Sequence, residues 1–178
     1  MRRYEAVDAL IEEYASRFAK VLQQICTCKR EYERNIDIVK LLSVGDEVVR
    51  CVRERRPCNL GFVEVRVIRK FLSQHVVIVV NGRELSVDDF NTLISRARLF
   101  SEWYDNDCSI DAYMYPIIGA DHYDAIREFL RRNLKELEKV CSGERPSLDF
   151  DGLPTYVVGG IKNAVSNYLL TGASGSSL

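Results

Sequence analysis

The sequence lacks any long apolar run, because charged residues interrupt its hydrophobic stretches throughout the 178 residues. A membrane-spanning helix needs about 18 or more consecutive apolar residues, so we expect no membrane partner. The first residues lead directly into a charged amphipathic pattern and not into a secretory signal. Together these absences predict a protein of the cytoplasm.

Recognisable catalytic and metal-binding motifs are missing as well. There is no P-loop, no G-x-G-x-x-G, no G-x-S-x-G and no H-E-x-x-H, and His75 and His122 are the only histidines. The six cysteines include one C-x-C, Cys26 and Cys28, but no paired C-x-x-C spacing of the kind that zinc requires. We therefore expect no enzyme, no cofactor and no metal. Without a secretory signal, the cysteines are expected to be reduced thiols.

Charge is nearly balanced but unevenly placed. The chain has 25 Lys and Arg against 26 Asp and Glu, a formal net charge of −1. Residues 1–100 carry a net charge of +4 and residues 101–178 a net charge of −5. An anionic partner would therefore contact the first half, or a basic ridge within the second half.

Two groups of basic residues stand out. Residues 47–72 alternate apolar residues with seven cations: Arg50, Arg53, Arg55, Arg56, Arg66, Arg69 and Lys70. In the second half, Arg127, Arg131, Lys135 and Lys139 recur every four residues and would form one ridge of a helix. Arginine suits phosphate because its planar guanidinium can donate two hydrogen bonds to it. A solvated charged face is the plainer explanation of each group taken alone.

Apolar residues recur with helical spacing over most of the chain. The spacing predicts helices over residues 4–28, over 36–56 with a break at Gly45 or a new start at Ser43, and over 86–104. A loop with a short helix follows over 105–120. Two further helices are expected, from Asp121 to the stop at Gly143 and from Pro154 to Gly172.

Residues 60–80 are ambiguous. Val63, Val67, Ile68, Phe71 and Leu72 fit a helical stripe, with Asn81-Gly82 as its stop. The same segment also alternates over 63–67 and has a β-branched run over 76–80, which is typical of strands. We predict a helix, because the surrounding segments are helical.

These patterns predict an all-α protein of two small helical-bundle subdomains, residues 1–104 and 105–178, with a disordered tail over 173–178. Helices that present arginines at four-residue spacing suit contact with a duplex backbone, and double-stranded RNA is read mainly through shape, phosphates and 2′-hydroxyls. A few phosphate contacts per subunit become useful when subunits assemble. The predicted RNA-binding residues are Arg50, Arg53, Arg55, Arg56, Arg66, Arg69, Lys70, Arg127, Arg131 and Lys135.

The order of features resembles a viral family. The opening Met1-Arg2-x-Tyr4 with Val7-Asp8-x-Leu10-Ile11, and the segment 85–90 (LSVDDF) followed by Trp103, are similar to the small RNA-silencing suppressors of closteroviruses of the beet yellows virus type. The resemblance covers nearly the whole chain, and none of its motifs is chemically specific.

The resemblance implies an all-helical protein of the host cytoplasm that assembles into a homo-oligomeric ring, an octamer being one option. It also implies binding and sequestering of siRNA or microRNA duplexes without sequence choice. Two alternatives stay open. One is a structural helical assembly protein of a virus. The other is a sheet-based binder of single-stranded nucleic acid, with strands over 62–68 and 76–80 and a turn at Asn81-Gly82.

Overall fold

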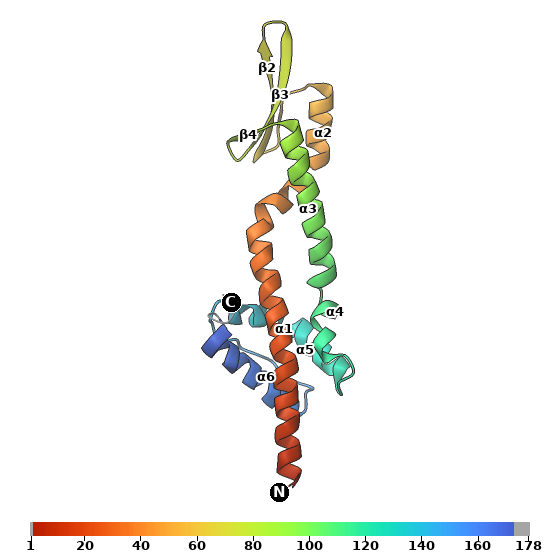
Figure 1. The fold of residues 1–178 in the computed structure, drawn as a ribbon, viewed down its shortest axis with the longest axis vertical. Helices are drawn as coiled ribbons and strands as arrows, with labels where there is room; N and C mark the ends of the chain where they lie inside the picture. Colours follow the sequence, from red (N-terminus) through yellow and green to blue (C-terminus); the bar gives the residue numbers. More distant parts are fainter. Residues whose placement is uncertain (1, 173–178) are drawn as a thin grey trace. The chain divides into compact units, whose positions relative to one another are not determined.

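The chain folds mainly into helices but contains a four-stranded antiparallel sheet, so the prediction of an all-α fold is wrong (Figure 1). The computed structural model describes residues 2–172, and the predicted disordered tail over 173–178 lies outside them. Helix accounts for 67% and strand for 13% of the structure. In chain order the main elements are α1 (Arg2–Lys40), α2 (Gly45–Glu54), β1 (Cys58–Asn59), β2 (Val63–Lys70), β3 (Ser73–Val80), β4 (Arg83–Leu85), α3 (Val87–Asp107), α4 (Ile110–Tyr113), α5 (Tyr123–Val140) and α6 (Thr155–Asn167).

Shorter turns of helix join these elements. A 3-10 helix, Leu41–Ser43, separates α1 from α2, and a second one, Tyr115–Ile117, follows α4. A single π-helical turn, Tyr168–Gly172, continues α6. The helices predicted from residue 4, residue 86 and Pro154 are confirmed, and the helix predicted from Asp121 begins two residues later, at Tyr123.

The chain divides into two compact units. One, the helical unit, combines Met1–Glu31 with Tyr104–Leu178, and the other, the arm unit, is Tyr32–Trp103. The helical unit is thus discontinuous in sequence, unlike the predicted subdomains 1–104 and 105–178. One predicted boundary, near residue 104, coincides with an edge of the arm unit.

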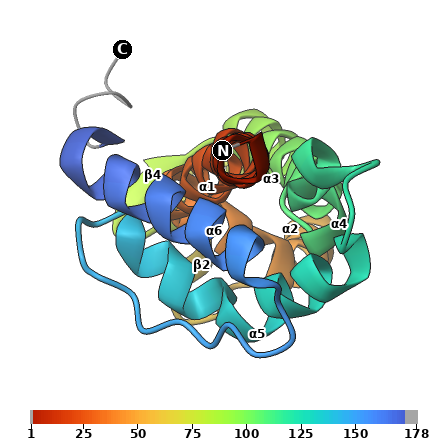
Figure 2. The same cartoon turned by 90° about the horizontal axis from the view of Figure 1, so that it is seen from below.

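The helical unit is built on the apolar face of α1. Tyr14, Phe18, Val21, Leu22 and Ile25 are buried, as their 3.6-residue periodicity predicts. The ring of Phe18 lies 6.2 Å from that of Phe129 on α5. Figure 2 shows the segment after α5 running back along that helix to the start of α6.

All six cysteines are paired, so the expectation of reduced thiols is wrong. Two disulfides close the helical unit, Cys26–Cys141 and Cys28–Cys108, over sequence separations of 115 and 80 residues. The third, Cys51–Cys58, joins residues only seven apart in the arm unit. Disulfides persist in oxidising compartments and in intracellular proteins of hyperthermophiles. The pairing therefore weighs against an ordinary reducing cytoplasm.

The arm unit packs a sheet of order β1-β2-β3-β4 against α2 and α3. Its core consists of Leu41, Val48, Cys51, Val63, Val65, Ile78, Phe90 and Ile94. Val63 pairs with Val80 and Val65 with Ile78 across the β2–β3 ladder, which puts alternate residues of both strands on the core face.

Residues 60–80 form strands where a helix was predicted. The run of β-branched residues in β3 and the alternation over residues 63–67 of β2 favour strands, since such side chains pack well on a pleated surface. Asn81 and Gly82 both have positive φ, so they form a hairpin turn and not a helix stop. The helical stripe in this segment arises by chance from the density of its apolar residues.

Candidate nucleic-acid interface

Half of the predicted site residues on and next to α2 are paired with carboxylates. The guanidinium of Arg50 lies 3.0 Å from the Glu47 carboxylate, and that of Arg56 lies 3.1 Å from Glu54. Arg53 and Arg55 make no ion pair within residues 2–172. Exposed pairs contribute little to stability, but each one cancels a charge that would otherwise attract a polyanion.

The outer part of the β2–β3 hairpin is basic and free of acidic residues. Residues 65–83 contain no Asp or Glu, whereas Arg66, Arg69, Lys70 and Arg83 are basic. Arg66 lies 2.8 Å from Glu64, at the inner end of the strand, but Arg69 and Lys70 make no ion pair within the described part of the chain. Because adjacent residues of a strand point to opposite faces, Arg69 and Lys70 supply one cation to each face of the hairpin.

The hairpin extends past β4 and α2 and ends in an unusual turn (Figure 1). Lys70 pairs with Ser73, so Phe71 and Leu72 alone form the turn, and both side chains are fully exposed. Phe71 has φ of 56°, in the left-handed region that glycine, asparagine or aspartate usually occupies in two-residue hairpins. The other tight turn of the same sheet follows this rule with Asn81-Gly82. We name residues 66–76 the hairpin tip.

The basic ridge on α5 belongs to the other compact unit and is largely neutralised. Arg127 lies 3.0 Å from Asp111, and this hydrogen-bonded pairing raises the pKa of the guanidinium. Arg131 lies 4.0 Å from Glu128. Lys135 makes no ion pair among residues 2–172. Lys139, the fourth cation of the ridge, lies 2.7 Å from Glu136. The ridge thus supplies one uncompensated cation of four.

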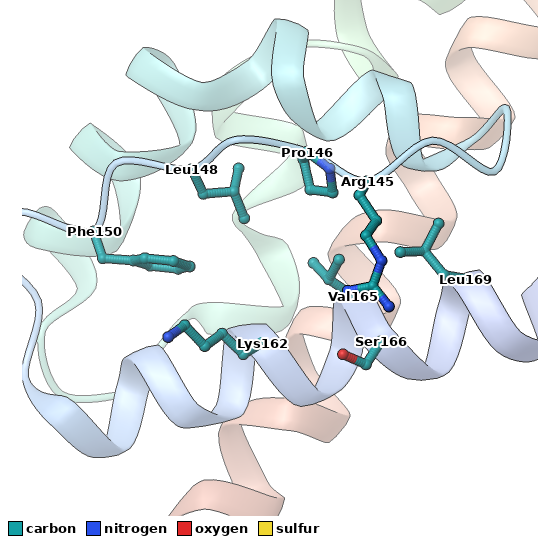
Figure 3. A pocket seen from close by; sticks show the side chains of 8 residues that line it. All are labelled: Arg145, Pro146, Leu148, Phe150, Lys162, Val165, Ser166 and Leu169. Atoms are coloured by element: carbon teal, nitrogen blue, oxygen red, sulfur yellow. The ribbon is translucent and has the colours of Figure 1, made fainter.

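A pocket in the helical unit carries two further cations that the sequence did not single out (Figure 3). It measures about 260 Å³. Arg145 reaches towards Ser166, and the Nζ of Lys162 lies 5.5 Å from the centre of the Phe150 ring. Its remaining lining residues are Pro146, Leu148, Val165 and Leu169. Such a pocket suits a small anion with an apolar part, but nothing further in it defines a reaction.

Neither a metal-binding cluster nor a membrane-spanning helix is found among residues 2–172. No group of three or more His, Cys, Asp or Glu side chains in that range could hold a metal ion. None of the helices described there is long and apolar enough to span a membrane. Comparison with protein-family models, with curated proteins and with solved structures finds no match.

Of the ten predicted site residues, Arg66, Arg69 and Lys70 lie together on strand β2. Arg50 and Arg53 lie on helix α2 of the same unit, and Arg55 and Arg56 directly follow that helix. The structure places Arg127, Arg131 and Lys135 in the separate helical unit. Sequence reasoning missed Phe71 and Leu72, which a helical interpretation assigns to the core. The available signal was an apolar pair in an acid-free segment, followed by residues with strong strand propensity.

Proposed function

We propose that the protein binds duplex nucleic acid without sequence selectivity, through the hairpin tip. The observation that supports this most is the pair Arg69 and Lys70, which lie in an acid-free segment without ion-pair partners in residues 2–172. A two-stranded β-ribbon is narrow enough to enter a groove of a duplex. Cations on both of its faces can reach the phosphates of the two strands.

The number of contacts sets the strength of binding. Two or three phosphate contacts per tip, counting Arg66 if it leaves Glu64, give a salt slope of about −2 to −3. One such tip binds weakly, so we propose that copies of the protein assemble and present several tips to one duplex. Linked contacts of this kind raise affinity without any new interaction.

The finer prediction is a viral suppressor of silencing that sequesters siRNA or microRNA duplexes in a ring in the host cytoplasm. It stays a proposal. The sheet departs from the all-helical fold that the resemblance implies, and the three disulfides weigh against a reducing location. The prediction that the chain is not an enzyme also stays a prediction.

The two alternatives gain less support. A sheet that binds single strands stacks bases on aromatic side chains, but β2 and β3 contain no Phe, Tyr or Trp and only one imidazole, that of His75. A helical assembly protein of a virus would bury exposed apolar helix faces against other subunits. No observation on residues 2–172 specifically favours such an assembly role.

The test measures fluorescence anisotropy of labelled RNA and DNA duplexes of about 20 base pairs, at about 50 and about 200 mM salt. The variant Arg69→Glu/Lys70→Glu reverses the two unpaired cations of the tip. Its matched control, Arg131→Glu/Lys135→Glu, makes the same change of net charge on the α5 ridge. We expect the tip variant to lose about tenfold or more in affinity and the control to lose about twofold or less.

Two results would contradict the proposal. Wild-type protein that leaves both duplexes unbound at low salt removes it altogether. Equal losses in the two variants would mean that overall charge, and not the hairpin tip, determines binding.

A further inference from the structure

At the turn of the hairpin tip, a large exposed apolar side chain coincides with left-handed backbone, a combination not repeated at the other non-glycine residues of positive φ within residues 2–172. Phe71 and Leu72 are both fully exposed, more so than the other large apolar residues of the described chain. Phe71 also adopts φ of 56°, which is rare for a bulky residue because its Cβ crowds the backbone. Ser73, which pairs with Lys70 across the turn, donates a hydrogen bond from Oγ to the Lys70 carbonyl at 3.0 Å and so helps to close the turn.

Folding alone gives no reason for this choice of residues. The pair buries no apolar surface in the arm unit, and an Asn-Gly turn like the one at residues 81–82 would close the hairpin with less strain. Strained backbone that persists without stabilising the fold is concentrated at functional sites. The turn is therefore best explained by something that it contacts outside the chain.

Resting on the proposed function, we propose that Phe71 and Leu72 form a wedge that inserts between neighbouring base pairs and locally unstacks the duplex. Proteins that bind the minor groove insert apolar side chains between base steps in this way. Arg69 and Lys70 directly precede the turn, so the wedge reaches bases while the cations hold the flanking phosphates.

The charges around the turn favour a polyanion over an apolar protein partner, since the nearest acidic residues in sequence are Glu64 and Glu84. An anionic membrane surface would attract the same cations. However, two side chains bury little apolar area, and stable anchoring to a membrane takes a larger apolar surface or a second signal. The slender, two-sided hairpin fits a groove better than it fits a flat surface.

Unstacking costs least where stacking is already interrupted, so the wedge gives the protein a preference for bulged or mismatched duplexes. The test uses full-length protein and two duplexes of the same length, one fully paired and one with a central bulge flanked by 2-aminopurine. We expect wild type to bind the bulged duplex roughly fivefold or more tightly, and to raise the fluorescence of 2-aminopurine as it unstacks.

The decisive variant is Phe71→Gly/Leu72→Ser. Glycine accepts the left-handed φ, so this variant folds at least as well as wild type. It should bind the paired duplex within about twofold of wild type with the same salt slope, but lose the preference for the bulge and the fluorescence rise. The control Leu99→Ser removes an exposed apolar side chain from α3, and it should retain both.

The outcomes separate the two proposals. No binding of either duplex by wild type would remove the proposed function. Binding without a bulge preference, or a preference that survives in Phe71→Gly/Leu72→Ser, would overturn the wedge alone. Wedge-dependent binding to vesicles of phosphatidylserine and phosphatidylcholine, with no change in 2-aminopurine fluorescence, would assign the turn to a membrane and would also overturn it.

Discussion

The two compact units use their basic residues differently. In the helical unit, Arg17 donates to the carbonyls of Pro116 and Ile118 at 3.1 and 3.3 Å, and Arg132 donates to the Asp151 carbonyl at 3.0 Å. These side chains hold loops in place. In the arm unit, the side chains of Arg69 and Lys70 make no ion pair within residues 2–172. A count of basic residues therefore overstates the number of unpaired cations in the helical unit.

The disulfides of the two units also differ, and removing them gives the largest expected loss of stability. Replacing both cysteines of the Cys26–Cys141 disulfide with serine should lower the free energy of unfolding by about 4 kcal/mol, because it frees a long loop in the unfolded chain. The same change at Cys51–Cys58 frees a loop of seven residues and should cost about 2 kcal/mol. Urea unfolding of the two double variants measures the difference. Equal losses would show that loop length does not determine the contribution of each bridge.

The next largest loss of stability is expected where α6 packs closely against α1 in the helical unit. A Cβ added at Gly160 would lie 2.6 Å from the Cβ of Tyr14 and 3.0 Å from backbone atoms of α1, so Gly160→Ala should destabilise the protein by about 2–3 kcal/mol. At the neighbouring Gly159 the nearest atom is 3.5 Å away, in the side chain of Ile11. Gly159→Ala should therefore be neutral or stabilising by up to about 1 kcal/mol, because alanine favours helix. Thermal unfolding of the pair tests this, and similar melting temperatures would disprove the close approach.

A buried polar side chain fixes the loop after α5. Asn133 is 3% exposed, donates to the carbonyls of Phe129 and Asp149 at 2.8 and 3.1 Å, and accepts from the Asp149 amide at 2.8 Å. Asn133→Ala removes the acceptor of the Asp149 amide and the two hydrogen bonds that the side chain donates, and should cost about 2 kcal/mol. The control Asn163→Ala changes an exposed residue of α6 and should alter stability by less than about 0.5 kcal/mol. A difference between the two in chemical unfolding confirms the role of the buried amide.

The smallest expected effect is on how the stability of the protein depends on pH. The pKa of Glu136 is lowered, first by its hydrogen bond with Lys139 at 2.7 Å and then by that with the Ser147 amide at 2.8 Å. A carboxylate with a lowered folded-state pKa stabilises the protein above its unfolded-state pKa, and this contribution disappears as the pH falls through the folded-state pKa. Glu136→Gln should therefore melt slightly below wild type at neutral pH and converge with it below the ordinary value of 4.5. A gap that persists in acid would assign the effect to packing.

Much of the helical unit could be predicted from sequence, because the stripes of α1, α5 and α6 each bury one face with a 3.6-residue period. The sheet of the arm unit could not, since Val63, Val67 and Ile68 satisfy both a helical and a strand pattern. Strand pairing with β3 resolves that conflict only in three dimensions. The disulfides were missed because Cys26 and Cys108 lack local spacing that identifies their partners. The α5 ridge was overestimated because Asp111, the partner of Arg127, is distant in sequence.

The Cys28–Cys108 disulfide has a topological consequence. The whole arm unit lies between these two cysteines in the sequence, and their Cα atoms are 5.8 Å apart. The chain therefore departs from the helical unit and returns to it at neighbouring positions, which is the arrangement of an inserted domain. A short peptide linker could replace the insert, and the excised module could be transplanted into another host scaffold at a similarly narrow pair of attachment points.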